Sequence, residues 1–149
     1  MGISMKVFAK NKRAKFDYEL KEQFYAGISL LGTEVKSIKN GDVDLTSSYV
    51  VIDKDGNAQW LNGKVKKYEF QTQGSHEESR TRQLLLHRKE IKKIASAIAE
   101  KRYTVVPYAI GATNKGHIKL ELYLAKGKNV KDKRETIKKR DQERESSRY

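Results

Sequence analysis

The sequence predicts a mainly β fold with peripheral α-helices, in which a small closed antiparallel barrel is followed by a disordered basic C-terminal tail. Short segments of alternating apolar and polar residues, separated by hairpin turns, predict the barrel, with an OB-like barrel as the leading candidate. The near absence of apolar residues after Gly127 predicts the tail. The 149 residues fit one domain, at 16–127, between a basic N-terminal arm (1–15) and the tail (128–149).

The N-terminal half of the barrel has the pattern of a strand, a short helix and a hairpin. Within residues 17–31, apolar residues recur at every second position, which is typical of a strand with one buried face. Thr33 is placed to be the N-cap of a short helix over residues 34–39. An Asp-Gly turn then joins a strand at residues 48–52 to its return strand at 58–65.

The C-terminal half contains a loop, a helix and two more strands. Residues 71–82 are polar and without period, which predicts a flexible loop. Residues 88–102 carry an apolar stripe at helical spacing and a basic outer face. The apolar run 103–110 predicts a strand, and its Pro107 favours an edge position or a bulge. Residues 118–124 alternate strictly, so Ile and Leu face inward and the intervening polar residues outward.

Charge is the strongest indication of a partner. The chain carries 32 Lys plus Arg against 19 Asp plus Glu, a net charge of +13. Residues 1–15 hold five basic residues and no acidic one, and residues 126–149 hold ten basic and five acidic ones. Residues 80–102 form a third basic region. A compact body with a basic belt and two basic ends is typical of a nucleic-acid-binding protein.

The sequence offers no motif for catalysis, a metal or a cofactor. Cysteine is absent, which excludes disulfides and thiol chemistry and fits a reducing, cytoplasmic compartment. The histidines His76, His87 and His117 have no metal-ligand spacing and are expected at the surface. No apolar run reaches the length of about 18 residues that spans a bilayer. We therefore expect a soluble, non-enzymatic protein.

Tyrosines near basic residues are the candidate RNA contacts. Tyr18, Tyr49 and Tyr123 lie in predicted strands, where a phenol ring either stacks on a base or covers the edge of the core. Lys119 points out of the strand 118–124, toward a partner or solvent. The alternatives to a dedicated RNA adaptor are a general RNA-binding ribosomal protein or RNA chaperone, a peripheral membrane protein using the helix at 88–102, and an enzyme acting on RNA.

Six motifs occur in order from residue 11 onward. They are Asn11-Lys12-Arg13-Ala14, Gly32-Thr33-Glu34-Val35-Lys36-Ser37, Asp44-Leu45-x-x-Ser48-Tyr49-Val50, Arg82-x-Leu84-Leu85-Leu86, Ala125-Lys126-Gly127-Lys128 and Asp132-Lys133-Arg134-x-x-Ile137-Lys138. Together they resemble the small protein B (SmpB) family, bacterial proteins that bind transfer-messenger RNA. Any one motif would be weak, but six in sequence are specific.

The resemblance implies a role in trans-translation, in which a ribosome stalled on a message without a stop codon is rescued. It implies that the barrel binds the elbow of the tRNA-like domain of transfer-messenger RNA. The tail would enter the decoding centre and the empty mRNA channel, fold there into a helix and report that no message is present. Elongation factor Tu acts on the same RNA. We expect a monomer without cofactors.

The resemblance also assigns residues. The RNA-binding positions of the barrel correspond to Lys12, Arg13, Tyr18, Tyr49, Leu85 and Lys119. The ribosome-engaging positions of the tail correspond to Lys128, Asp132, Lys133, Arg134 and Ile137. This chain departs from the family pattern at Tyr25, where relatives usually have an acidic residue, and at Lys131, where they often have an aromatic residue or His. The first departure replaces a hydrogen-bond acceptor by a stacking ring, and the second replaces a stacking group by a phosphate contact.

Overall fold

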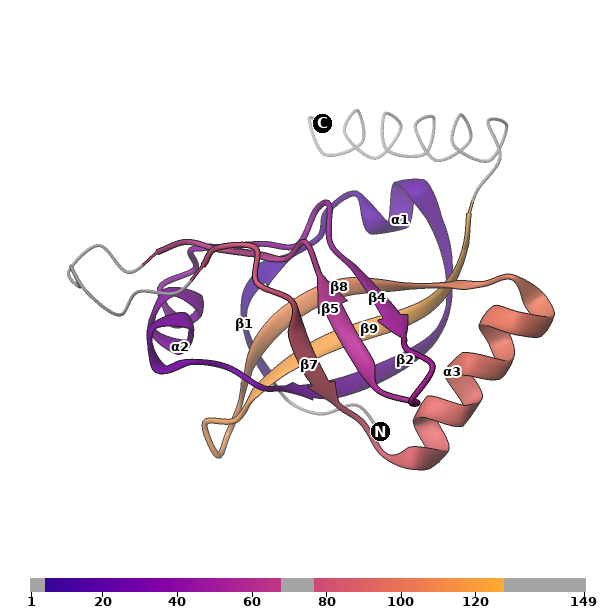
Figure 1. Cartoon of the computed structure of the whole chain (residues 1–149). Helices are drawn as coiled ribbons and strands as arrows, with labels where there is room; N and C mark the ends of the chain where they lie inside the picture. Colours follow the sequence, from indigo (N-terminus) through magenta and orange to yellow (C-terminus); the bar gives the residue numbers. More distant parts are fainter. Residues whose placement is uncertain (1–4, 68–76, 128–149) are drawn as a thin grey trace, which may run out of the picture.

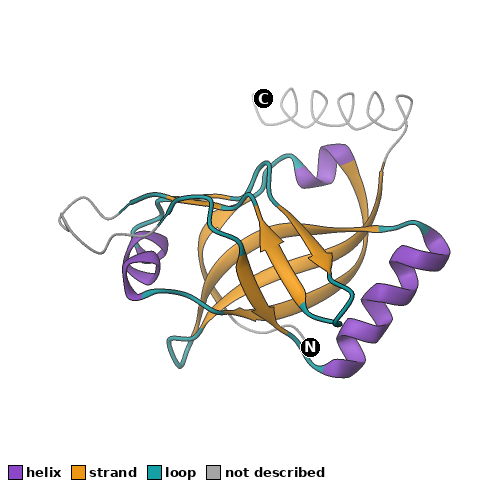
Figure 2. Cartoon of the chain, in the orientation of Figure 1, coloured by secondary structure: helices purple, strands orange, loops and turns teal. Residues whose placement is uncertain are grey.

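The computed structural model describes residues 5–67 and 77–127, and this part of the chain is mainly β with peripheral helices, as predicted (Figures 1 and 2). Its elements in chain order are β1 (Met5–Lys10), α1 (Ala14–Asp17), β2 (Tyr18–Ile28), α2 (Gly32–Lys39), β3 (Val43–Asp44), β4 (Tyr49–Ile52), β5 (Ala58–Leu61), β6 (Lys64–Val65), β7 (Arg82–Leu85), α3 (Arg88–Lys101), β8 (Thr104–Thr113) and β9 (Ile118–Gly127). No helix in the described ranges is long and apolar enough to cross a membrane.

Seven of the strands form one antiparallel sheet in the order β1-β8-β4-β5-β7-β2-β9. Because β8 also pairs with β9, the strands from β8 to β9 in this order form a continuous ring, and β1 extends it at β8. The short strands β3 and β6 pair separately. Helices α2 and α3 lie on opposite sides of the ring (Figure 1).

The core fills the inside of the ring. The predicted alternation of β9 is confirmed, since Leu120, Leu122 and Leu124 are buried and the residues between them are partly exposed. Ile38 of α2 and Ile94 of α3, both fully buried, join this core from the two sides. The apolar stripe predicted for residues 88–102 therefore faces the ring, which leaves the basic face of α3 outside.

A buried ion cluster joins α2 to β7. Glu34 and Arg82 have fully buried side chains, and Arg82 Nε donates to Glu34 Oε2 at 2.6 Å. Arg80 Nη2 donates to Glu34 Oε1 at 2.6 Å, and the Leu31 amide donates to the same oxygen at 2.8 Å. Arg82 also donates to the carbonyl of Gly63 at 2.8 Å. Every strong donor and acceptor of the pair is thus used inside the protein.

Several local predictions are wrong in a physically clear way. Thr33 is not the N-cap of α2, because the helix begins at Gly32 and the N-cap is Leu31, whose amide hydrogen bond to Glu34 fixes this end. The predicted flexible loop 71–82 does not include its last residue, because Arg82 begins β7 and is buried by its bond to Glu34. The return strand 58–65 is interrupted where Asn62 adopts a φ of 58°, which separates β5 from β6.

Two further expectations concern strand positions. Of the basic arm predicted at residues 1–15, residues 5–10 form β1, which pairs with β8 and brings Phe8 against the core. Pro107 lies at a bulge rather than at an edge, because β8 is paired with β9 there and the register shifts between Pro107 and Ala109. The predicted tail, 128–149, lies outside the described residues, as do residues 71–76 of the predicted loop.

Candidate nucleic-acid interface

The outward side of the β2–β9 pair forms a continuous surface, which we call the β2–β9 face. The inward pairs Phe24–Leu122 and Ala26–Leu120 belong to the core. Directly opposed residues in an antiparallel pair point to the same side, and the next pair points to the other. The alternate pairs Gln23–Tyr123, Tyr25–Glu121 and Gly27–Lys119 therefore lie side by side on the face.

At one end of the face, the short helix α1 presents cations beside tyrosines. Lys12 and Arg13 precede α1 and are exposed. The Arg13 guanidinium lies 5.2 Å from the Phe16 ring centroid, and its Nε is 3.5 Å from Asp17 Oδ2. Buried Ala14 anchors the helix on the outside of the sheet, in a small apolar cluster with Val106 and Ala125 against which Tyr18, Leu20 and Tyr108 pack.

The aromatic part of this end consists of Tyr18, Tyr108 and Tyr123, which we call the tyrosine cluster. Tyr108 and Tyr123 meet edge to face with ring centroids 5.4 Å apart. Lys15 Nζ lies 5.7 Å from the Tyr108 centroid. Burial raises the pKa of Tyr123, and the Glu121 carboxylate raises it further. The phenol therefore stays protonated near neutral pH and can donate a hydrogen bond.

Tyr49 lies on β4, the strand that pairs with β8. Val50 of β4 pairs with Val105 of β8. Because the two strands are antiparallel, the residue before Val50, Tyr49, is opposite the residue after Val105, Val106. Val106 packs with Ala14 in the small apolar cluster. The Tyr49 side chain is 41% exposed.

The other end of the face brings three strands together at Gly27. Gly27 is opposite Leu85 on β7 and opposite Lys119 on β9. A Cβ at Gly27 would lie 3.3 Å from Leu85 Cβ and 3.7 Å from Lys119 Nζ, so the lysine side chain extends over the glycine backbone. Leu85 is 58% exposed. Leu85, Lys119 and Tyr25 line a groove of about 430 Å³. The groove therefore combines the ammonium of Lys119 with the apolar surface of Leu85.

A polar network connects the two ends. Gln23 Nε2 donates to Glu121 Oε1. The same nitrogen also donates to the Tyr25 hydroxyl, at 3.0 Å. The Tyr25 hydroxyl donates to Glu121 Oε1 at 3.4 Å. Burial raises the pKa of Tyr25, and the charge of Glu121 raises it again. The hydroxyl of Tyr25 is therefore held as a donor to Glu121.

Five of the six barrel positions expected to bind RNA thus lie in two groups, at the two ends of the β2–β9 face. Lys12 and Arg13 directly precede α1 and Tyr18 directly follows it, whereas Leu85 and Lys119 meet at Gly27. The sixth, Tyr49, lies on β4, which pairs with β8, and lines a groove next to α3. The strand between the groups spans roughly 30 Å at about 3.3 Å per residue. The tail positions Lys128, Asp132, Lys133, Arg134 and Ile137, and the departure Lys131, lie outside the described residues.

Sequence reasoning missed α1, Lys15, Tyr108 and Glu121 as parts of this surface. Tyr108 follows Pro107 at a bulge, and a bulge interrupts the alternation of inward and outward residues along a strand. Glu121 was placed correctly on the outward side of its strand, but nothing in the sequence indicates its cross-strand partners. His87 and His117 are exposed, as expected, while His76 lies outside the described ranges. Within those ranges no three His, Cys, Asp or Glu residues are grouped to hold a metal.

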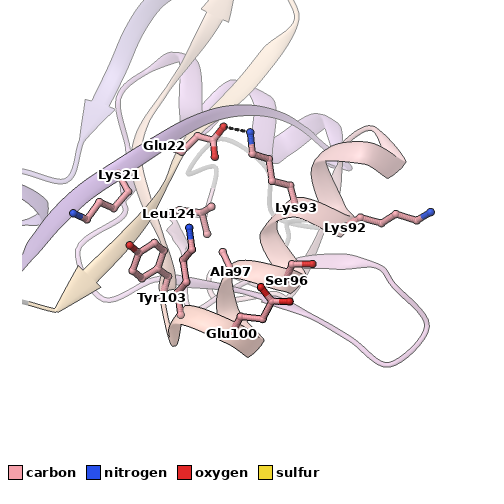
Figure 3. Close-up of a pocket in the computed structure, with 10 residues that line it drawn as sticks. Lys21, Glu22, Lys92, Lys93, Ser96, Ala97, Glu100, Tyr103 and Leu124 are labelled. Carbon is pink, nitrogen blue, oxygen red and sulfur yellow. Dashed lines mark ion pairs between the residues drawn. The ribbon is translucent and has the colours of Figure 1, made fainter.

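A second groove lies elsewhere, between α3 and the β2–β9 pair (Figure 3). It has a volume of about 790 Å³, and none of the six expected RNA-binding residues lines it. Lys93 Nζ reaches across it to Glu22 Oε1 at 2.5 Å, and Lys21, Lys92 and Glu100 also line it. Its cations therefore stand among carboxylates.

Comparison with known proteins finds matches over nearly the whole chain. The family model described as SmpB protein matches residues 8–149. A protein named SsrA-binding protein from Parvibaculum lavamentivorans is 42% identical over 147 residues, which cover 99% of this chain and 89% of that protein. Another of the same name from Rhodopseudomonas palustris is 44% identical and covers 97% of this chain and 91% of its own length. A solved structure described as "tmRNA-SmpB: a journey to the center of the bacterial ribosome" has 36% identity and a TM-score of 0.69, covering 87% of this chain and 93% of that one.

Proposed function

The chain belongs to the SmpB protein family, and from this premise we propose that it binds transfer-messenger RNA and delivers it to ribosomes stalled on messages without a stop codon. It acts in trans-translation as an RNA-binding protein and not as an enzyme. The observation that carries the proposal is that positions far apart in the sequence, Lys12, Arg13 and Tyr18 beside α1 and Leu85 and Lys119 at Gly27, lie at the two ends of the β2–β9 face.

The chemistry of the β2–β9 face supports RNA as its ligand. Exposed cations at α1 attract the phosphate backbone, and the tyrosine cluster offers rings for stacking together with hydroxyl donors. At the far end, the Lys119 ammonium and the exposed Leu85 side chain suit a phosphate and the apolar side of a ribose or base. A face of roughly 30 Å reaches two neighbouring loops of a folded RNA, and we propose the tRNA-like domain as that RNA.

The remaining parts of the assignment are proposals on the same premise. The ring of strands is an OB-like closed barrel over residues 16–127, preceded by a basic arm at 1–15. Residues 128–149 sense the empty mRNA channel through Lys128, Asp132, Lys133, Arg134 and Ile137. The partners are transfer-messenger RNA, the decoding centre and mRNA channel of the ribosome, and elongation factor Tu through the RNA complex. The protein works in the cytoplasm as a monomer.

Replacing Lys119 with alanine tests the role of the β2–β9 face. We expect the affinity for the tRNA-like domain to fall at least about fivefold, and the slope of log K against log salt to decrease by about one phosphate contact. Filter binding or fluorescence anisotropy at several salt concentrations measures both quantities.

Lys92→Ala is the matched control, because Lys92 is an exposed lysine of α3 that lines the other groove. It should leave both quantities unchanged. Equal affinity and slope for Lys119→Ala and the unmodified protein would place Lys119 outside the interface. Equal binding of the tRNA-like domain and an unrelated structured RNA would favour a general RNA-binding protein instead.

A further inference from the structure

The β2–β9 face carries a carboxylate in the middle of a surface suited to phosphates. Glu121 is partly exposed, and none of the ion pairs found within residues 5–67 and 77–127 includes it. Lys119, two residues away on the same side of β9, extends over Gly27 rather than toward Glu121. An acid so placed repels a phosphate backbone, and no ion pair in the described ranges offsets that cost.

The carboxylate is held in place by neutral donors. Both Gln23 Nε2 and the Tyr25 hydroxyl donate to Glu121 Oε1, and a side-chain hydrogen bond with Glu121 contributes to the raised pKa of Tyr123. These donors orient the side chain. Because an ionised carboxylate has about four lone-pair sites, it remains able to accept a further hydrogen bond from a ligand.

The surroundings fit a flat ligand with N–H groups. The Tyr123 ring is beside Gln23 and the Tyr25 ring is beside Glu121 on neighbouring strands. The raised pKa values of both tyrosines keep their hydroxyls protonated, so Tyr25 continues to support the carboxylate. A carboxylate oxygen accepts but does not donate, so it discriminates between ligand groups by their donors.

We propose that Glu121, Gln23 and Tyr25 form a nucleobase subsite in which the Glu121 carboxylate accepts the exocyclic amino N–H of one unpaired guanine, while Lys119 contacts an adjoining phosphate. Guanine is favoured because its Watson–Crick edge presents two adjacent N–H donors, whereas adenine and cytosine each present one amino group beside a ring nitrogen that repels a carboxylate. The subsite rests on the proposed RNA-binding function and adds to it a base preference and the residue that produces it.

Analogue interference on the tRNA-like domain tests the subsite. Transcripts are made in which a small fraction of guanosines is replaced by phosphorothioate-tagged inosine, which lacks the exocyclic amino group. RNA bound by the unmodified full-length protein is expected to be depleted of inosine at one unpaired position. With Glu121→Gln, interference at that position should disappear while other positions keep theirs, and affinity for unmodified RNA should fall about fivefold or more.

Two variants separate recognition from structure. Gln23→Ala removes a support of the carboxylate but keeps the acceptor, so the interference should persist with a smaller loss of affinity. Glu100→Gln removes an acid that lines the α3 groove, and its interference pattern should equal that of the unmodified protein. Thermal unfolding of each variant identifies any loss of affinity that comes from misfolding.

Three results would overturn the subsite. One is Glu121→Gln binding as tightly as the unmodified protein with an unchanged pattern. A second is interference from 2′-deoxynucleotides rather than inosine at the position that responds to Glu121. That result would show that the Glu121 carboxylate accepts a hydrogen bond from a ribose 2′-hydroxyl instead of from a base. The third is a failure of the unmodified protein to bind the RNA at all, which would remove the proposed function together with the subsite, whereas the first two leave that function intact.

Discussion

Replacing Glu34 with glutamine is expected to lower the free energy of unfolding by about 3–5 kcal/mol, because it leaves the Arg82 guanidinium buried without a counter-charge. Both side chains are fully buried, with 2.6 Å between Arg82 Nε and Glu34 Oε2. The glutamine amide can keep one acceptor, but it cannot offset the charge of Arg82 together with that of Arg80. Urea denaturation followed by circular dichroism measures the change.

Glu22→Gln is the matched control. Glu22 also forms an ion pair, with Lys93, but the two side chains are 39% and 61% exposed. Solvent screens such a pair, and we expect a loss below about 1 kcal/mol. Similar losses for Glu34→Gln and Glu22→Gln would show that water reaches the Glu34 cluster and that the burial argument is wrong.

The Glu34 cluster also predicts the pH dependence of stability. Burial on its own would raise the pKa of the Glu34 carboxyl, but hydrogen bonds from Arg80, the Leu31 amide and Arg82 outweigh it, so the pKa lies below its ordinary value of 4.5. A lowered pKa in the folded state means that the stabilisation is complete above the unfolded value and is lost as the pH falls through the folded one. The free energy of unfolding should therefore decrease below about pH 4.5, and less steeply in Glu34→Gln, as urea titrations between pH 3 and pH 7 would record.

The ion cluster bears on function through its position. Arg82 begins β7, and Leu85 at the end of the same strand stands beside Gly27 on the β2–β9 face. Glu34 anchors this strand to α2 from the opposite side. Because β7 has only four residues, a cluster that fixes its first residue also fixes the position of Leu85 at its end. A stable Glu34 cluster therefore contributes to the shape of the candidate interface.

The elements that the sequence predicts best are those whose hydrophobic period is uninterrupted. The strand at 118–124 and the helix at 88–102 were found almost to their ends, because one side of each is uniformly apolar. Arg82 was assigned to a polar loop because charged residues are ordinarily exposed, and only the tertiary contact with Glu34 makes its burial favourable.

The sequence predicts which single residues of the candidate interface face outward, but not which of them lie next to one another. Alternation along β9 identifies Lys119 and Tyr123 as outward-facing, yet it does not indicate which strand lies beside them. Register shifts between Leu20 and Glu22 in β2, and at Pro107 in β8, change the side to which later residues point. The tyrosine cluster depends on these two bulges, so a strictly periodic interpretation separates residues that the fold brings together.

Removing residues 128–149 should abolish rescue of stalled ribosomes while leaving the affinity for the isolated tRNA-like domain within about tenfold. Strand β9 ends at Gly127, so the deletion removes none of the six barrel residues expected to bind RNA. The deleted segment does carry a surplus of basic residues, so some non-specific affinity is lost with it, most visibly at low salt. Anisotropy with labelled RNA measures binding, and the yield of tagged peptide from a message without a stop codon measures rescue.

The full-length variant with Asp132, Lys133 and Arg134 all replaced by alanine separates the two explanations of such a result. If the tail acts through specific contacts in the ribosome, this variant should rescue as poorly as the deletion, although it keeps most of the tail's charge. If the tail supplies only positive charge, the variant should retain most of the tagged-peptide yield. A deletion that weakened RNA binding and rescue in equal proportion would contradict the division of labour between face and tail, because binding and sensing would then belong to one surface.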